Sequence, residues 1–98
     1  MNRKDRRAAR AEGRLDTTGF LRLADRFIDL ANRENRKVQA TQVHMAFLFA
    51  AARYNAFVAK SILQIDNHEE FVETMTGEYR DMLRQHLADD AIAAPMEK

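Results

Sequence analysis

The sequence predicts an all-α protein, a three-helix up-down-up bundle with a basic, mobile N-terminal arm. Three observations favour this fold class. The chain of 98 residues is 46% apolar and 32% charged, which is too apolar for a disordered chain. It holds only three Gly and one Pro, too few breakers for the many turns of a β-protein. Apolar residues also recur at helical spacing in three successive segments, and this length accommodates one domain.

The expected organisation has three parts. Residues 1–16 hold few apolar side chains and form a basic flexible arm. Residues 17–92 form the three-helix domain, and residues 93–98 form a tail. The helices are expected over about 18–35, 40–64 and 67–89.

The first predicted helix is amphipathic. Phe20, Leu23 and Phe27 lie on a broad apolar face at helical spacing, and charged residues occupy the opposite face. Its N-cap is Asp16, Thr17 or Thr18. The short polar connection over 34–38 favours an antiparallel second helix.

The central predicted helix is apolar over most of its circumference, so it needs neighbours on several sides. One chain supplies only two other helices. The sequence therefore predicts a homodimer or another protein partner that covers part of this helix. The residues expected at that interface are Phe49, Ala52, Arg53, Ala56, Phe57 and Lys60.

The third predicted helix starts with a capping-box pattern, in which Asp66 is followed three residues later by Glu69. Acidic residues in the first turn also match the positive end of the helix dipole. Gly77, within this helix, lowers helix propensity without a visible reason.

Three polar residues, His44, Asn55 and His86, fall on faces that are otherwise apolar. Counted along the hairpin of the second and third helices, His44 and His86 come to the same level, and Glu34 ends the first helix near that level. Two imidazoles and a carboxylate suit zinc or iron, which makes a metal-dependent activity one hypothesis. The His-x-x-x-His and Glu-x-x-His spacings are missing, however. We expect His44, Asn55 and His86 to be structural polar residues of the core, with no metal and no cofactor.

The residue types argue against catalysis. The chain has no Cys, which excludes disulfides and cysteine nucleophiles, and its single serine, Ser61, has no base at a plausible spacing. The three glycines are isolated and form no phosphate-binding loop. We therefore expect a non-enzymatic interaction or regulatory protein.

The net charge of +1 conceals a gradient along the chain. Residues 1–14 carry six basic and two acidic side chains. Residues 15–60 carry seven basic and four acidic ones, and residues 61–98 carry three basic and nine acidic ones. A basic arm suggests an alternative function, binding to a nucleic-acid backbone. The residues expected to make that contact are Arg3, Lys4, Arg6, Arg7, Arg10 and Arg14. The longest apolar run, 45–52, is too short to cross a bilayer, and we expect a cytoplasmic location.

Three stretches carry a resemblance to a known family. They are Leu-Ala-Asp-Arg-Phe-Ile-Asp-Leu-Ala-Asn over 23–32, Ala-Ala-Ala-Arg-Tyr-Asn-Ala-Phe-Val over 50–58, and Glu-Tyr-Arg-Asp-Met-Leu over 78–83. Together they resemble an uncharacterised family of short bacterial α-helical proteins, known as a domain of unknown function. The resemblance spans about residues 20–90 and omits the arm. It implies a bacterial source and a compact α-helical domain, and it assigns no catalytic residue.

Overall fold

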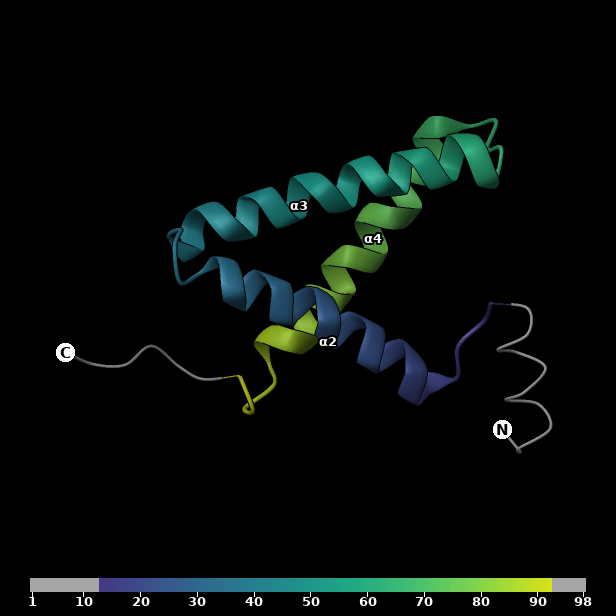
Figure 1. The fold of residues 1–98 in the computed structure, drawn as a ribbon. Coiled ribbons are helices and arrows are strands. Elements are labelled where there is room, and N and C mark those ends of the chain that lie inside the picture. The colour runs from purple at the N-terminus through teal and green to yellow at the C-terminus, as the bar shows by residue number, and fades with distance from the viewer. Residues whose placement is uncertain (1–12, 93–98) are drawn as a thin grey trace. The chain divides into compact units, whose positions relative to one another are not determined.

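The computed structural model describes residues 13–92, and over this range the protein is all-α, which confirms the predicted fold class. The elements are α2 (Thr17–Glu34), α3 (Ala40–Phe57), the π-helix η1 (Val58–Ile62) and α4 (His68–Leu87) (Figure 1). The described residues contain no strand. The predicted arm over 1–16 and the tail over 93–98 lie largely or wholly outside the described residues.

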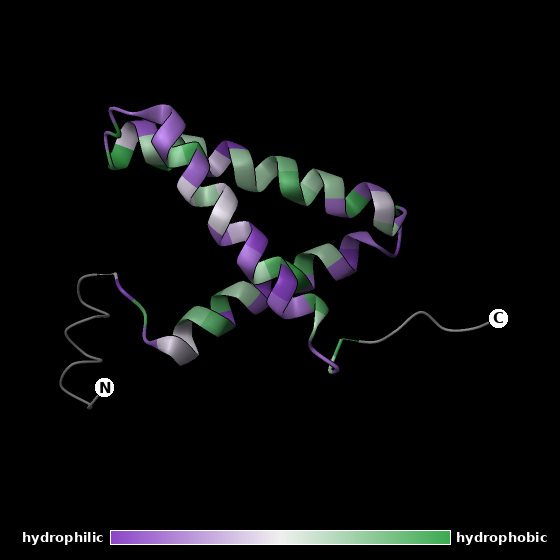
Figure 2. Ribbon diagram, turned by 180° about the vertical axis from the view of Figure 1, so that it is seen from behind, coloured by the Kyte–Doolittle hydropathy of each residue, from purple (hydrophilic) through white to green (hydrophobic). Residues whose placement is uncertain are grey.

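The chain divides into two compact units, Met1–Arg53 and Tyr54–Lys98. The first unit contains α2 and most of α3, and the second contains the end of α3, η1 and α4. The division falls inside α3, whose ribbon is coloured as apolar over most of its length (Figure 2).

Helix α2 begins where its sequence provides a cap. Asp16 is the N-cap, and the Gly19 N–H donates to its Oδ1 at 2.8 Å, which satisfies one of the free donors of the first turn. Gly19 is suited to this turn, because a Cβ there would lie 3.1 Å from that oxygen. The helix is strongly amphipathic, as the sequence predicts, and it ends at Glu34 with Asn35 as C-cap.

A short turn joins α2 to α3, and the chain reverses direction there (Figure 1). The Lys37 and Val38 N–H groups both donate to the Glu34 carbonyl, at 3.0 and 2.9 Å. Helix α3 then starts at Ala40, with the Gln39 carbonyl accepting from Val43 at 3.0 Å. These hydrogen bonds satisfy backbone carbonyl and N–H groups that would otherwise have no partner at the two helix ends.

Helix α3 changes into a π-helix at its C-terminal end. The helix expected over about 40–64 is α-helical to Phe57 and π-helical over Val58–Ile62, where the Leu63 N–H donates to the Val58 carbonyl at 2.9 Å. Gln64 then has a φ of 53°, and the Ile65 N–H bonds back to the Ala59 carbonyl at 2.9 Å. This left-handed residue ends the helix as a glycine cap usually does.

Helix α4 is capped one residue later than the sequence analysis predicts. Asn67 is the N-cap, and its Oδ1 accepts from the Glu70 N–H at 3.0 Å. The prediction of Asp66 was wrong because both residues can cap and both are followed three positions later by a glutamate.

The cap can be tested directly. We expect Asn67→Ala to lower the free energy of unfolding by about 1 kcal/mol, because the Glu70 N–H loses its acceptor. Asp66→Ala removes a carboxylate that is not the cap and serves as the matched control. Urea unfolding followed by circular dichroism, at one fixed protein concentration, measures both. A larger loss for Asp66→Ala would restore the original assignment.

Gly77 lies inside α4 with free space around it. A Cβ at this position would meet nothing within 4 Å. We therefore expect Gly77→Ala to raise the free energy of unfolding by about 0.5–1 kcal/mol, since it restricts the unfolded chain and favours the helix. Gly19→Ala is the control, because its Cβ would crowd the Asp16 cap. Equal gains in urea unfolding for both variants would contradict this explanation.

Candidate interaction surface

The two sides of α3 differ in exposure although both are apolar. Val43, Ala51 and Asn55 in α3, followed by Val58 in η1, are half-buried and lie on one side at helical spacing. The opposite side is exposed along its whole length. The apolar residues of α3 are spread around the helix, but its few polar residues, Gln42 and Arg53, both fall on the exposed side.

The exposed side forms a continuous surface that we call the Phe49 stripe. Its members are spaced three or four residues apart, so that successive side chains lie along one face. Phe49 is 70% exposed and Met45 53% exposed, which is unusual for large apolar side chains in a helix interior. The stripe consists of Gln42, Met45, Phe49, Ala52, Arg53 and Ala56, with Lys60 following in η1; all are exposed.

Five of the six residues predicted for an interface lie on this stripe, and the structure brings them to one side of the helix. The sixth, Phe57, lies beside it and is 50% exposed. Its ring centroid is 5.9 Å from that of Tyr54, in a tilted pair at 36°. Sequence reasoning omitted Met45, although its spacing of four residues before Phe49 was a usable signal.

The Phe49 stripe has apolar residues between Gln42 at its start and the basic residues Arg53 and Lys60 toward its end. Between Lys37 and Lys60, Arg53 is the only side chain with a full charge. Ala52 and Ala56 leave shallow places on the helix surface next to the bulky Met45 and Phe49. A surface of this composition is suited to contact with another helix, since small residues let a second backbone approach and large ones fill the space between.

The three residues predicted as polar core lie in different surroundings. Asn55 is half-buried, whereas His44 and His86 are exposed. His44 lies in the first unit and His86 in the second. Their structural role stays a prediction. No group of three His, Asp or Glu side chains placed to hold a metal occurs within residues 13–92.

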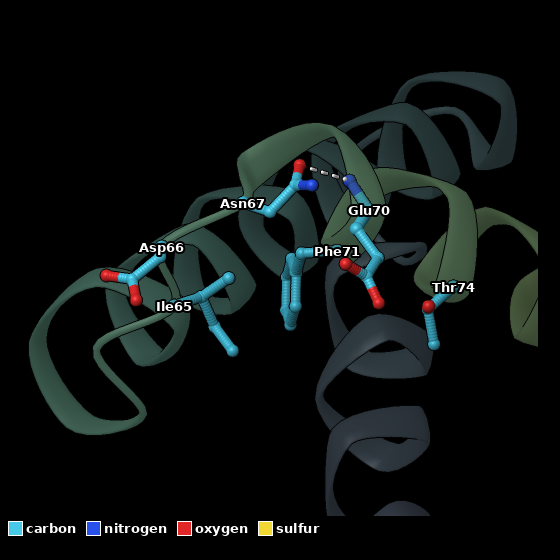
Figure 3. A pocket seen from close by; sticks show the side chains of 6 residues that line it. All are labelled: Ile65, Asp66, Asn67, Glu70, Phe71 and Thr74. Carbon is cyan, nitrogen blue, oxygen red and sulfur yellow. Dashed lines mark hydrogen bonds between the residues drawn. The ribbon is translucent and has the colours of Figure 1, made fainter.

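A hollow of about 430 Å³ lies at the start of α4, within the second unit (Figure 3). Its lining combines apolar side chains, Ile65 and Phe71, with the carboxylates of Asp66 and Glu70; Asn67 and Thr74 complete it. The Asn67 side chain is committed to capping the helix, as the dashed bond to Glu70 in Figure 3 shows. The hollow is therefore lined by both apolar and acidic residues.

Comparison with known protein families identifies the family to which the chain belongs. The model of a family described as a protein of unknown function (DUF3144) matches residues 20–91. The chain belongs to the DUF3144 family. This confirms the resemblance drawn from the three sequence stretches, and its extent agrees with the range expected from them. Searches of curated proteins and of solved structures gave no match.

The DUF3144 region includes the whole Phe49 stripe and the hollow. It leaves out the basic segment predicted to contact nucleic acid. Of those residues Arg3, Lys4, Arg6, Arg7 and Arg10 lie outside the described part of the chain, and Arg14 is described and exposed. Among the helices of residues 13–92, none combines the length and apolar character needed to cross a membrane.

Proposed function

We propose that this DUF3144 protein is a small non-enzymatic interaction protein that associates with a second copy of itself through the Phe49 stripe. One observation carries the proposal: the half-buried residues of α3 lie on one side, and on the opposite side two large apolar residues, Met45 and Phe49, are exposed. Contiguous exposed apolar surface of this kind is typical of protein–protein contacts. A regulatory role and a cytoplasmic location belong to the same proposal.

Large apolar side chains are also exposed outside α3. This supports a partner that would bury exposed apolar surface of this chain. On α2, Phe20, Phe27 and Ile28 are each more than half exposed, and Ala59 is the single buried residue that the structure shows between residues 13 and 92. Chains of this size bury a smaller share of their surface than larger domains do, and association adds to it. A second copy is a sufficient partner, because an isologous contact uses the same patch twice.

Sedimentation equilibrium of the full chain tests the proposal. We expect a monomer–dimer equilibrium with a dissociation constant in the micromolar range or below. A single species at the monomer mass, 11.3 kDa, at concentrations well above this range would reject self-association through any surface. Circular dichroism of the same samples shows whether the chain is folded when it is measured.

The basic N-terminal segment supports a second candidate function, binding of a nucleic-acid backbone. Residues 1–14 carry six basic and two acidic side chains. Such binding depends steeply on salt and little on base sequence. Filter binding of RNA and DNA at low and moderate salt, with the full chain and with a variant lacking residues 1–14, tests it. Equal binding by both chains, or none by the full chain, would exclude the arm as a contact.

A further inference from the structure

We infer that the hollow at the start of α4 binds a basic segment of a protein partner, which places one apolar side chain in the hollow and Lys or Arg side chains beside it. All six lining residues belong to the second unit, so the hollow lies within one unit. None of them belongs to the Phe49 stripe, and this contact is therefore separate from the proposed self-association. Two observations carry it, the make-up of the hollow and the charge of the chain around it.

The hollow accepts an apolar group. Its volume of about 430 Å³ lies within the range of ligand-binding clefts, about 300–1,000 Å³. Ile65 and Phe71 are half-buried, and Figure 3 shows their side chains between those of Asp66 and Glu70. An apolar side chain that entered the hollow would contact Ile65 and the Phe71 ring. The apolar surface removed from water by this contact would favour binding.

The chain around the hollow is negatively charged. Residues 61–79 include five acidic residues and no Lys or Arg. The helix dipole accounts for Glu69 and Glu70, which lie in the first turn of α4, but Asp66 and Glu73 add negative charge outside that turn. Among the described residues of the second unit, none forms an ion pair with Asp66 or Glu70. Both carboxylates are therefore open to a cation that a partner brings.

A segment that is both basic and apolar matches this hollow better than other ligands do. A nucleic acid would bring its phosphates against the carboxylates. An inorganic cation would make no use of Ile65 and Phe71, and residues 13–92 contain no group of three side chains placed to hold a metal. The stem of a Lys or Arg side chain can lie on the Phe71 ring while its charged end reaches a carboxylate. The matching partner segment therefore has basic residues on either side of an apolar one.

An NMR titration of the isotope-labelled full chain at neutral pH tests the site with three synthetic peptides. The first, acetyl-Lys-Arg-Leu-Arg-Lys-amide, has basic residues around one leucine. The second replaces that leucine with serine, and the third replaces the four basic residues with glutamate. We expect the first peptide to shift the backbone signals of residues 65–74. The serine peptide is expected to bind about tenfold more weakly, because it loses the apolar contact, and the acidic peptide to cause no shift.

The double variant Asp66→Asn, Glu70→Gln is expected to bind the leucine peptide about fivefold more weakly, because it removes both charges and keeps the side-chain sizes. It leaves the cap in place, since the Glu70 N–H donates to Asn67 through the backbone. Glu73→Gln, Glu78→Gln is the matched control, which removes two exposed charges of α4 outside the lining. We expect its affinity to stay within about twofold of the unsubstituted chain.

Three results would overturn the site. Equal losses in the two double variants, or equal affinities of the leucine and serine peptides, would reduce the contact to general charge attraction. Shifts confined to residues outside 65–74, or no shift, would place the contact elsewhere or remove it. A single-stranded RNA that shifted the same signals more strongly than the leucine peptide would replace the basic segment by a polyanion. A monomer mass in sedimentation equilibrium would reject the proposed self-association and leave this site unaffected.

Discussion

Phe49→Glu is expected to shift the monomer–dimer equilibrium strongly toward the monomer while the helices stay folded. The Phe49 side chain is 70% exposed, so the substitution removes little packing within the chain. In the proposed contact it would remove the largest apolar side chain of the stripe and replace it with a carboxylate that Arg53, four residues on, can pair with at the surface. Losing the burial of a phenylalanine side chain costs about 1.5–3 kcal/mol, which corresponds to a loss of affinity of about 10- to 100-fold.

The measurement is sedimentation equilibrium over a range of protein concentrations. Phe20→Glu is the matched control, because it makes the same chemical change at a phenylalanine that is 63% exposed and lies at the start of α2. Circular dichroism confirms that both variants keep their helical content. If Phe49→Glu and Phe20→Glu weakened association equally, the effect would come from added charge in general. The Phe49 stripe would then no longer be assigned as the surface through which two copies associate.

Ala59→Leu is expected to destabilise the protein more than any other single apolar substitution proposed for it. Ala59 is 5% exposed, and its carbonyl accepts the Ile65 N–H where the chain turns back after η1. A larger side chain has no free volume there and must displace its surroundings. Overpacking of this kind costs about 1–3 kcal/mol.

Urea unfolding at one fixed protein concentration measures this loss. Ala50→Leu is the control, since Ala50 is an exposed alanine of α3 and the same atoms added there meet solvent. We expect its free energy of unfolding to stay within about 0.5 kcal/mol of the unsubstituted chain. A similar loss at both positions would show that the close packing around Ala59 does not persist in solution.

The existence of the three helices could be predicted from the sequence because each is marked by several independent signals. In α2 a cap at Asp16, an amphipathic pattern and a polar turn all agree. The start of α4 shows where such signals fail. Asp66 and Asn67 are both competent caps with a glutamate three residues on, so residue types alone do not decide between them.

The π-helix was not predictable from residue types. Its defining feature is a shift in backbone hydrogen bonding, and Val58–Ile62 contains no residue that demands it. The candidate site was partly predictable. The composition of α3 identified the helix and five of the stripe residues. The few polar residues, Gln42, Arg53 and Lys60, fall on the exposed side and marked it in the sequence, but the exposure of Met45 and Phe49 between them required coordinates.

The π-helix has a consequence for how this protein family can vary. A π-helical turn carries one residue more than the α-helical turn it replaces. Removing one residue from Val58–Ile62 would therefore restore an α-helical turn and leave the direction in which the chain exits nearly unchanged. The Phe49 stripe up to Ala56 would keep its geometry. The length of the chain can thus vary by one residue at η1 without altering the surface that α3 presents.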